Sequence, residues 1–410
     1  MRILHTSDWH LGRSFHGASL LDEQAEALDR IVALVEEHRV ELVVVAGDLY
    51  DRAVPPAPAV DLFERTLPRL RAAGARIAAI SGNHDSAVRI GVRDQLLGAA
   101  GVAVRGDVAR IAEPLVLERP ADGGPPVAVY LVPFLEPSVD AAVLAELAGP
   151  AEAVAPRRPG EPAPVVALTR RASHDHALRL AAGAARRHLA TLGPARSVLV
   201  AHAFVAGGTP SDSERELSVG GADRVALSSL DGFDLVALGH LHRPQDVAGP
   251  RIAYSGSPLP YSFSEEGRTP SVRLVELAAD GSVTAEHVPL GVGRPLRTLT
   301  GRLDELLADP ALASAEPARV RAVLTDDHLP VQAMARLRRR FPHAVELRHE
   351  PPVPAGRPGT VAADLREIEA AAPIDLALRF WADQQGRPAS PAERAVLERA
   401  VAAAGPEGLP

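Results

Sequence analysis

The chain has 410 residues, of which 23% are charged and 46% are apolar, and its formal net charge is −8. This length favours two or three domains with a large core, and the composition is that of a globular soluble protein. The absence of cysteine excludes disulfides, thiolate metal sites and a cysteine nucleophile, so His, Asp, Glu or Asn must bind any metal. The acidic balance argues against a surface that is basic throughout but leaves room for a local basic groove.

The sequence contains no run of about 18 apolar residues, so no membrane span is predicted. No charged-then-apolar leader precedes Asp8 and His10. We therefore expect a cytoplasmic protein. The 44 basic residues are all arginine, since the sequence contains no lysine. Together with the abundant alanine and proline this points to coding bias, so the number of arginines by itself indicates little about function.

The first part of the chain alternates between apolar runs and helical patterns. Apolar residues at helical spacing predict helices over residues 21–38 and 58–73. Continuous apolar runs predict strands over residues 3–5, 42–46, 76–80, 102–117 and 127–132. This rhythm is typical of a parallel sheet with helices on its faces.

Residues 139–196 interrupt this pattern with a proline-rich, solvated loop over 150–164 and a helix over 173–192. His174 and His176 lie on that helix, but residues at i and i+2 do not share a face, so we do not expect them to bind a metal. Strands then resume over residues 197–201, 235–238, 251–254 and 271–278.

The C-terminal part has a different character. Residues 295–309 are expected to form a linker and a short helix. A strand, a helix and a strand are then predicted over residues 319–325, 330–340 and 344–349, and after a linker at 351–359 an amphipathic helical segment over 364–404 with a break at 386–391. The stripe of Leu376, Phe380 and Trp381 could pack on its own domain, but we favour a partner surface because the segment follows a linker and has no evident core.

Five predicted strands end in side chains that can bind metals. These side chains are Asp8 and His10, Asp48, Asn83 and His84, His202, and His240 and His242. One such ending, the turn Gly82-Asn83-His84-Asp85, is as typical of an ordinary turn as of a site. Five endings at one edge of a sheet are not expected from core residues, because each buried polar group would need its own partner.

This mixture of ligands predicts a two-metal site. In such a site a carboxylate can bridge two ions about 3.5–4 Å apart, and neutral imidazoles complete each shell without excess charge. A pair of ions of this kind clamps a phosphate and activates a water for in-line attack at phosphorus. The sequence therefore indicates hydrolysis of a phosphoester.

The motifs, taken in order, resemble those of the calcineurin-like metallophosphoesterases over roughly residues 1–260. They are Asp8-x-His10, Gly47-Asp48-x-x-Asp51, Gly82-Asn83-His84-Asp85, a lone His202 and Gly239-His240-x-His242. Four further stretches resemble one branch, the SbcD nucleases of bacterial SbcCD complexes. They are Leu4 to Gly12, Ser211-Asp212-Ser213-Glu214-Arg215, Ala237 to Gln245 and Tyr254 to Pro258.

The resemblance implies an α/β fold, in which a metallophosphoesterase β-sandwich flanked by helices spans residues 1–290. It also implies an α/β capping domain at 295–350 and a helical segment at 360–405 that docks on the coiled coil of an SbcC-type ATPase. The implied activity is that of a metal-dependent DNA exonuclease and endonuclease, acting on double-stranded ends and hairpins in repair, recombination and replication. A homodimer within a heterotetramer is expected.

The same resemblance assigns roles to the candidate residues. One divalent ion, most often Mn²⁺ in the family, would be bound by Asp8, His10, Asp48 and His242, and the second by Asp48, Asn83, His202 and His240. His84 would face the phosphate and relieve charge on the leaving oxygen, and Asp85 would orient its imidazole.

Several assignments stay open. Asp51 could hold the turn after Asp48 or contact His10 or a water. His5 is expected in the core or at its rim, and Arg13, Arg89 and Arg93 are candidates for contacts with DNA phosphates. The alternative function is a phosphoesterase acting on small phosphoesters, such as a nucleotide or protein phosphatase. A non-catalytic scaffold for DNA ends would keep the fold without the chemistry.

Overall fold

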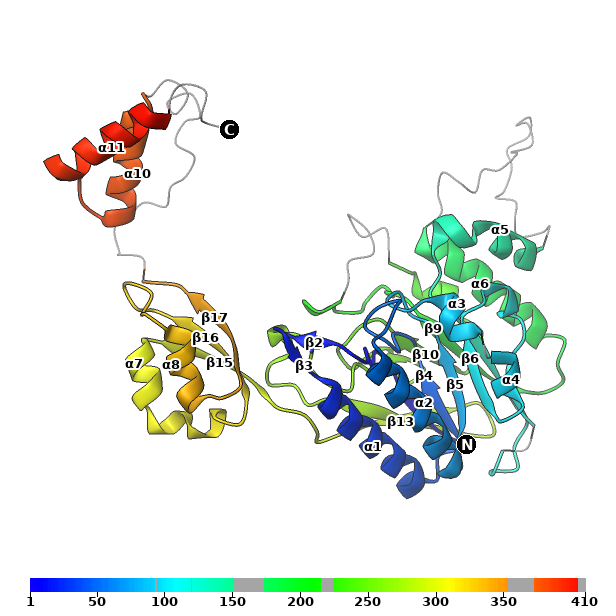
Figure 1. Cartoon of the computed structure of the whole chain (residues 1–410). Helices are drawn as coiled ribbons and strands as arrows, with labels where there is room; N and C mark the ends of the chain where they lie inside the picture. The colour runs from blue at the N-terminus through cyan, green and yellow to red at the C-terminus, as the bar shows by residue number, and fades with distance from the viewer. Residues whose placement is uncertain (93, 119, 150–172, 215–223, 353–371, 405–410) are drawn as a thin grey trace, which may run out of the picture. The chain divides into compact units, whose positions relative to one another are not determined.

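The computed structural model describes the chain except for residues 93, 119, 150–172, 215–223, 353–371 and 405–410 (Figure 1). Three parts of the sequence discussed above lie outside the described residues. They are the loop expected at 150–164, Arg93, and the first residues of the helical segment expected from 364. The chain divides into two compact units, residues 1–351 and 352–410. No helix of the described residues is long and apolar enough to cross a membrane.

The first sheet has six strands, and its parallel part is built from the N-terminal strand–helix rhythm. Its order is β14-β13-β1-β4-β5-β6, with β1 (Arg2–Thr6), β4 (Leu42–Val45), β5 (Arg76–Ile80) and β6 (Val102–Arg105) parallel, and with β13 (Ser271–Leu277) and β14 (Val283–Pro289) antiparallel. Helices α1 (Leu21–His38) and α2 (Ala57–Ala72) cover one face, where Leu28, Ile31 and Leu62 join Val43 and Ile77 in one core.

The second sheet also has six strands and is covered by two other helices. Its order is β11-β12-β10-β9-β8-β7, with β7 (Leu115–Leu117), β8 (Val127–Val132), β9 (Arg196–His202), β10 (Leu235–Gly239), β11 (Gln245–Ala248) and β12 (Ile252–Tyr254). Helices α5 (Pro137–Ala148) and α6 (His174–Leu189) contribute Leu144, Leu178 and Ala181 to the core on its outer face, together with Tyr130 and Leu199.

The inner faces of the two sheets pack against each other. Successive side chains of a strand point to opposite faces, so Val43 packs under the helices while Val44 packs toward the second sheet. Ala78 of the first sheet and Val200 and Ala237 of the second share this inner core with Val44. The β-sandwich flanked by helices, expected from the resemblance, is therefore confirmed.

The strand–helix rhythm alone was misleading in one respect, because it predicted that all five polar strand ends lie on one sheet. In the structure β1, β4 and β5 belong to the first sheet, whereas β9 and β10 belong to the second. Sequence periodicity reports which residues are buried but not which strands become neighbours. The polar strand ends of the two sheets meet at one edge of the sandwich.

Most predicted elements are observed within about three residues, and α1 has the predicted bounds, but the strand predicted over residues 102–117 is instead two strands, β6 and β7, which belong to different sheets. The pattern missed the short elements β2 (Ser14–Phe15), β3 (Ala18–Ser19), α3 (Ala87–Gly91) and α4 (Asp94–Gly98), and also α5, β11, β14 and β15 (Leu296–Gly301). Strand β14 pairs only with β13 and is mostly exposed, so it lacks the apolar run that marks a buried strand. Residues 295–309 are therefore not only a linker and a helix, since β15 precedes α7 (Leu303–Ala308).

A small three-stranded sheet ends the first unit. Strands β15, β16 (Arg319–Leu324) and β17 (Ala344–His349) are parallel, and α7 and α8 (Ala333–Arg340) complete a separate core around Val320, Leu337 and Phe341. The second unit contains two described helices, α10 (Pro373–Gln385) and α11 (Pro391–Ala404).

Candidate metal centre

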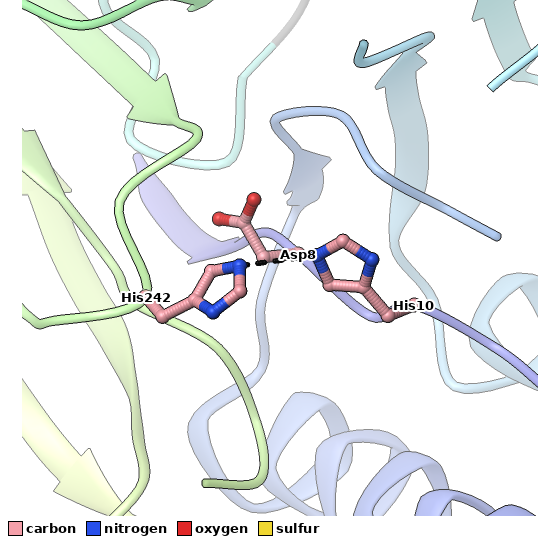
Figure 2. Close-up of side chains that lie close together, drawn as sticks. All are labelled: Asp8, His10 and His242. Atoms are coloured by element: carbon pink, nitrogen blue, oxygen red, sulfur yellow. Dashed lines mark hydrogen bonds between the residues drawn. The ribbon is translucent and has the colours of Figure 1, made fainter. Parts of the chain in front are cut away.

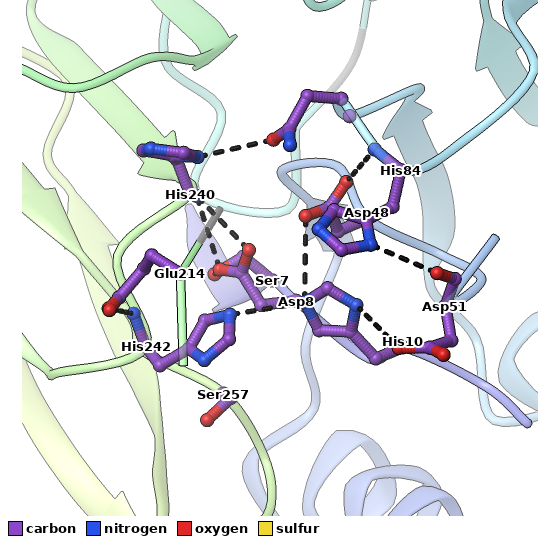
Figure 3. A network of polar contacts seen from close by, with 12 residues as sticks. Ser7, Asp8, His10, Asp48, Asp51, His84, Glu214, His240, His242 and Ser257 are labelled. Atoms are coloured by element: carbon purple, nitrogen blue, oxygen red, sulfur yellow. Dashed lines mark hydrogen bonds and ion pairs between the residues drawn. The ribbon is translucent and has the colours of Figure 1, made fainter. Parts of the chain in front are cut away.

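Every expected ligand, and the proposed catalytic residue His84, lies at or just beyond the carboxyl end of a parallel strand. Asp8 and His10 follow β1, Asp48 follows β4, Asn83 and His84 follow β5, His202 ends β9, and His240 and His242 follow β10. Figure 3 shows side chains from both sheets meeting in one polar network. Open α/β sheets bind ligands at this edge because their strand ends supply convergent loops.

Four of these ligands have an unusual backbone conformation. Asp8, His10, Asp48 and His240 have φ values of 54°, 45°, 50° and 104°. Such left-handed backbone costs about 1–3 kcal/mol for each non-glycine residue and persists only where the surroundings impose it. Backbone hydrogen bonds supply that constraint, from Asp8 N to Gly47 O at 3.0 Å and from His10 N to Asp48 O at 2.9 Å.

In extended backbone, residues two apart such as Asp8 and His10 would point to the same side, but these two residues do not continue the strand. Strand β1 ends at Thr6, and the two ligands lie in the loop that follows. Their left-handed conformations direct both side chains into the site. The two side chains therefore converge through the conformation of the loop and not through the alternation of a strand.

Three glycines allow the ligand loops to approach one another. A Cβ at Gly82 would overlap the Asp48 carboxylate, and one at Gly239 would overlap the carbonyl oxygen of Ala46. At Gly47, where φ is +95°, a Cβ would overlap the ring of His202. Each glycine directly precedes a ligand in the sequence, which is a signal that sequence reasoning could have used.

The first group of ligands contains Asp8, His10 and His242, which Figure 2 shows in close-up. The Nε2 atoms of His10 and His242 lie 3.1 Å apart, and one ligand atom from each of the three residues lies within 4.8 Å of the others. All three residues are buried, with exposed fractions of at most 3%. Two imidazole nitrogens and a carboxylate that face one another suit a divalent cation.

The second group contains Asn83, His202 and His240. Asn83 Oδ1 lies 2.9 Å from His202 Nε2 and 3.2 Å from His240 Nδ1. Asp48 Oδ2 lies 3.6 Å from His202 Nε2 and 3.5 Å from His10 Nε2, so this single oxygen is close to both groups. That is the placement required of a carboxylate shared by two ions.

The charges of the site favour bound cations. Burial raises the pKa of Asp8 well above its usual range, and the neighbouring Asp48 raises it further. Burial likewise raises the pKa of Asp48, and it lowers the pKa values of His202 and His240 to about 3. The imidazoles are therefore neutral, the form that binds metal, and a cation would relieve the cost of two buried carboxylates.

Hydrogen bonds select the nitrogen that each imidazole presents to the site. His202 Nδ1 lies 2.9 Å from Ala46 O, and His84 Nδ1 lies 2.9 Å from Asp51 O. A carbonyl oxygen only accepts, so Nδ1 of each ring must donate, and Nε2 of neutral His202 keeps its lone pair. Outer partners of this kind orient ligand histidines in metal sites.

Asp85 does not have the role that was expected of it. Its carboxylate accepts hydrogen bonds from the backbone N–H groups of Gly82, Leu49 and Tyr50 at 2.9–3.0 Å. The ring of His84 is held instead by the carbonyl oxygen of Asp51. Asp85 ties the loop after β4 to the loop after β5, because three convergent N–H donors satisfy a carboxylate better than one ring nitrogen.

His84 lies at the rim of the two ligand groups and is half-buried. Its backbone N–H donates to Asp48 Oδ1 at 2.9 Å, and its ring contacts that of His10 with centroids 4.7 Å apart. A nitrogen of its ring comes within 4.8 Å of ligand atoms of His10 and Asp48. The side chain is therefore next to the site while remaining accessible to a substrate.

Other residues left open by the sequence now have positions. Asp51 Oδ1 lies 3.7 Å from His10 Nδ1 and 3.5 Å from Arg13 Nη1, which favours a role beside the ligands. His5 is fully buried, and its Nε2 lies 3.0 Å from Leu238 O, as expected for a core residue. Arg89 is exposed.

The helix histidines do not join the site. His176 Nδ1 is hydrogen-bonded to Arg179, and neither His174 nor His176 belongs to a group of potential metal ligands among the described residues.

The sequence did not predict the residues that hold His242. The carboxylate of Glu214 accepts a hydrogen bond from the His242 backbone N–H at 2.8 Å, and Ser213 Oγ lies 2.6 Å from His242 Nδ1. Both residues belong to the stretch Ser211 to Arg215, which carried part of the resemblance but no assigned role. Ser7 similarly donates to Asp8 Oδ2 at 2.6 Å.

Comparison with known proteins identifies the family of the chain. A model of the calcineurin-like phosphoesterases matches residues 1–117, and a model described as the type 5 capsule protein repressor C-terminal domain matches residues 292–385. The chain is 37% identical over 300 residues to SbcD, the nuclease of the SbcCD complex of Bacillus subtilis (strain 168), and the match covers 72% of this chain and 71% of that protein.

Solved structures resemble the chain only distantly. TT1561 of Thermus thermophilus is 14% identical, with a TM-score of 0.35 over 70% of this chain and 98% of that protein. A dimetal phosphatase from Danio rerio is 14% identical, with a TM-score of 0.34 over 71% of this chain and 96% of that protein. These likenesses carry no argument about function, whereas the sequence identity to the Bacillus protein does. The chain therefore belongs to the SbcD family of SbcCD complexes, whose members are metal-dependent nucleases with a calcineurin-like phosphoesterase domain.

Proposed function

We propose that this chain hydrolyses phosphodiester bonds of DNA, as an exonuclease and endonuclease on double-stranded ends and hairpins. The observation that carries the proposal is the position of Asp48 Oδ2, within 3.6 Å of a nitrogen in each ligand group. Such a shared carboxylate suits two divalent ions, and we propose Mn²⁺ as the working metal. The site would act in repair, recombination and replication of DNA in the cytoplasm.

The proposed ligands follow the two groups. Asp8, His10, Asp48 and His242 would hold one ion, and Asp48, Asn83, His202 and His240 the other. Bound there, the ions would supply positive charge to the phosphate and lower the pKa of an attacking water.

His84 is proposed as the residue that relieves the charge on the leaving oxygen. Its Nδ1 is committed to the carbonyl oxygen of Asp51, so Nε2 is the atom that can hold or release a proton. The half-buried position of its ring leaves that atom accessible to a phosphodiester. Asp85 supports this role indirectly, because it fixes the loop that carries His84.

The partner is proposed to be an SbcC-type ATPase, bound through the C-terminal helices. In α10 the side chain of Phe380 is 67% exposed, and in α11 that of Val396 is 54% exposed. Exposed apolar residues on helices suit insertion into a groove or packing on a coiled coil. We keep the proposed division into residues 1–290, 295–350 and 360–405, with the last segment as the docking element.

A homodimer is proposed through the surface that follows the site. Val88 and Val92, at α3 (Ala87–Gly91), and Leu96, in α4 (Asp94–Gly98), are 80%, 72% and 80% exposed. Three large apolar side chains so close together in the chain favour an interface over solvent. Leu96→Glu should shift the protein from dimer to monomer in light scattering, and an unchanged mass would exclude this surface.

A panel of substrates tests the function. Linear and hairpin DNA would be compared with small phosphomonoesters, with Mn²⁺ or Mg²⁺ present and after chelation. We expect metal-dependent cleavage of DNA and little release of phosphate from monoesters. Activity confined to monoesters would establish the small-substrate phosphatase instead.

A further inference from the structure

A half-buried serine and a buried glutamate lie next to the proposed metal ligand His242. Ser213 Oγ is 2.6 Å from His242 Nδ1 and 2.7 Å from Glu265 Oε1. Glu265 is 4% exposed and His242 is 3% exposed. The three groups therefore form a continuous chain of hydrogen bonds, from a ligand toward the interior, that the proposed reaction does not by itself require.

The direction of these hydrogen bonds follows from the donors available. A carboxylate only accepts, so the Ser213 hydroxyl donates its proton to Glu265. The same hydroxyl oxygen must then accept from His242 Nδ1–H. This leaves the lone pair on His242 Nε2, the atom that faces His10 Nε2 at 3.1 Å.

This direction holds where Glu265 is ionised. Burial raises the pKa of Glu265 to about 7, and the hydrogen bond from Ser213 opposes that rise. Above about pH 7 the group is a carboxylate. The nearby Ser211 hydroxyl donates to a second carboxylate, that of Glu214, with Ser211 Oγ 2.8 Å from Glu214 Oε2.

Glu265 is itself held by the turn in which it lies. Its Oε2 accepts from Tyr261 N at 3.4 Å, and the neighbouring Glu266 accepts from the Thr298 N–H of β15 at 2.9 Å. The ring of Phe263, in the same turn, lies 4.6 Å from the guanidinium of Arg321 in β16. Contacts with the small C-terminal sheet thus hold the turn that carries Glu265.

We propose that Ser213 and Glu265 are positioning residues that hold the His242 imidazole as its Nδ1–H tautomer and so prepare Nε2 to bind a metal ion. This deepens the proposed metal centre and rests on it. The alternative interpretation is that these hydrogen bonds only join two loops and do not affect the imidazole. The two interpretations differ in what they predict for the imidazole and for one of two metal sites.

The first test measures metal binding, without any substrate. Calorimetric titration with Mn²⁺ alone should show two sites in the wild type. Ser213→Ala and Glu265→Ala should each weaken one site by about 10–100-fold, the usual effect of removing an outer partner of a ligand histidine. The site built on Asn83, His202 and His240 should keep its affinity.

Matched controls lie in the same two loops. Ser264 Oγ accepts from Asp212 N at 3.0 Å and so joins the loops without touching His242. Ser264→Ala and Glu266→Gln should leave both Mn²⁺ affinities within about twofold of the wild type. Ser213→Thr, which restores a hydroxyl, should recover most of the affinity lost in Ser213→Ala.

The second test observes the imidazole directly. Long-range ¹H–¹⁵N NMR spectra of histidine-labelled, metal-free protein should show His242 as the Nδ1–H tautomer in the wild type. Ser213→Ala should shift it toward a mixture of tautomers, while Ser264→Ala should not. A double variant of Ser213 and Glu265 should weaken metal binding no more than either single variant, because both act on one chain of hydrogen bonds.

The outcome that overturns the proposal is specific. If folded Ser213→Ala bound two Mn²⁺ ions like the wild type with an unchanged His242 tautomer, the residues would only join two loops. That result leaves the nuclease function intact, because DNA cleavage by the wild type is assayed separately. Conversely, wild-type protein that bound two ions but cleaved only monoesters would refute the proposed substrate and leave the positioning role standing.

Discussion

The proposed metal centre and the C-terminal helical unit differ in how far their side chains are buried. At the metal centre Asp8, His10 and Asp48 are at most 2% exposed and have left-handed backbone. In α10 and α11 none of the described side chains is buried, and Phe380 is 67% exposed. The proposed metal centre is built into the core, whereas the proposed partner surface keeps its apolar groups exposed.

The contrast has an energetic origin. Left-handed backbone and buried carboxylates cost free energy, which only a large packed sandwich can offset. Two short helices bury too little apolar surface to offset such costs. A partner that binds them would therefore add to their stability. The following experiments change one region at a time, and each should leave the other unaffected.

The largest effect is expected from the carboxylate shared by the two ligand groups. Asp48→Asn should lower metal-dependent DNA cleavage by about 10⁴-fold or more, because both ions lose a charged ligand. Metal content measured by mass spectrometry should fall with activity. Asp61→Asn, which changes an exposed carboxylate on α2, should keep both, and two bound ions in Asp48→Asn would refute the bridging role.

His84→Gln should separate binding from chemistry. We expect about 10²–10⁴-fold slower cleavage, since a general acid contributes on that scale, with two metal ions still bound. Cleavage at the wild-type rate would show that His84 neither transfers a proton nor stabilises charge. Loss of one ion would instead make His84 a ligand.

Gly82→Ala tests how tightly the ligand loops are packed. The added Cβ would overlap the Asp48 carboxylate, so the shared oxygen must move and Mn²⁺ affinity should fall by about 10–100-fold. Gly98→Ala is the control, since nothing lies within 4 Å of its Cβ. Equal affinities in the two variants would show that the loops can relax.

Phe380→Glu addresses the other region. Co-purification with an SbcC-type ATPase should be lost or weakened by about 30-fold or more, the scale of a hot-spot residue. Mn²⁺-dependent cleavage by the isolated chain should not change. Gln385→Glu adds the same charge at an exposed position away from Phe380 on α10, and equal loss of binding in both variants would implicate charge and not the apolar stripe.

The smallest effect concerns acid. Burial lowers the pKa values of His202 and His240 to about 3, whereas unfolded histidine titrates near 6.5. Between about pH 6.5 and 3 these two histidines bind more protons in the unfolded state, so their contribution to the stability of metal-free protein falls as the pH falls. The raised carboxyl pKa values of Asp8 and Glu265 act in the opposite direction, but both the wild type and His202→Asn contain these groups. Between pH 6.5 and 5 the thermal midpoint should therefore fall by about 2 °C more in the wild type than in His202→Asn. Parallel curves would contradict the assignment.

The sequence motifs predicted the fold and the strand ends that carry the candidate ligands, whereas the strand–helix rhythm did not predict which strands pair. Each of Asp48, Asn83 and His240 follows an apolar run and a glycine, and that local signal needs no knowledge of the fold. The pairing of strands was mispredicted because periodicity does not distinguish one sheet from two. Strand β14 was missed because its exposed residues have no apolar pattern.

The outer partners of the ligands were the least predictable. Asp85 follows His84 directly and was expected to orient its imidazole, yet its oxygens accept hydrogen bonds from backbone N–H groups of two loops. Glu265 lies in none of the motifs and is 52 residues along the chain from Ser213, and only folding brings the two side chains within 2.7 Å. Contacts of this kind depend on which loops meet.

By itself the sequence determined which residues can bind metal, which segments are buried and which helical segment lacks a core. These properties are local, because they depend on side-chain chemistry and on spacing along the chain. Only the tertiary structure decided that two sheets share one edge, that Asp48 lies between both ligand groups, and that Ser213 and Glu265 stand behind His242. These are distances between residues far apart in sequence, and the packing of the sandwich sets them.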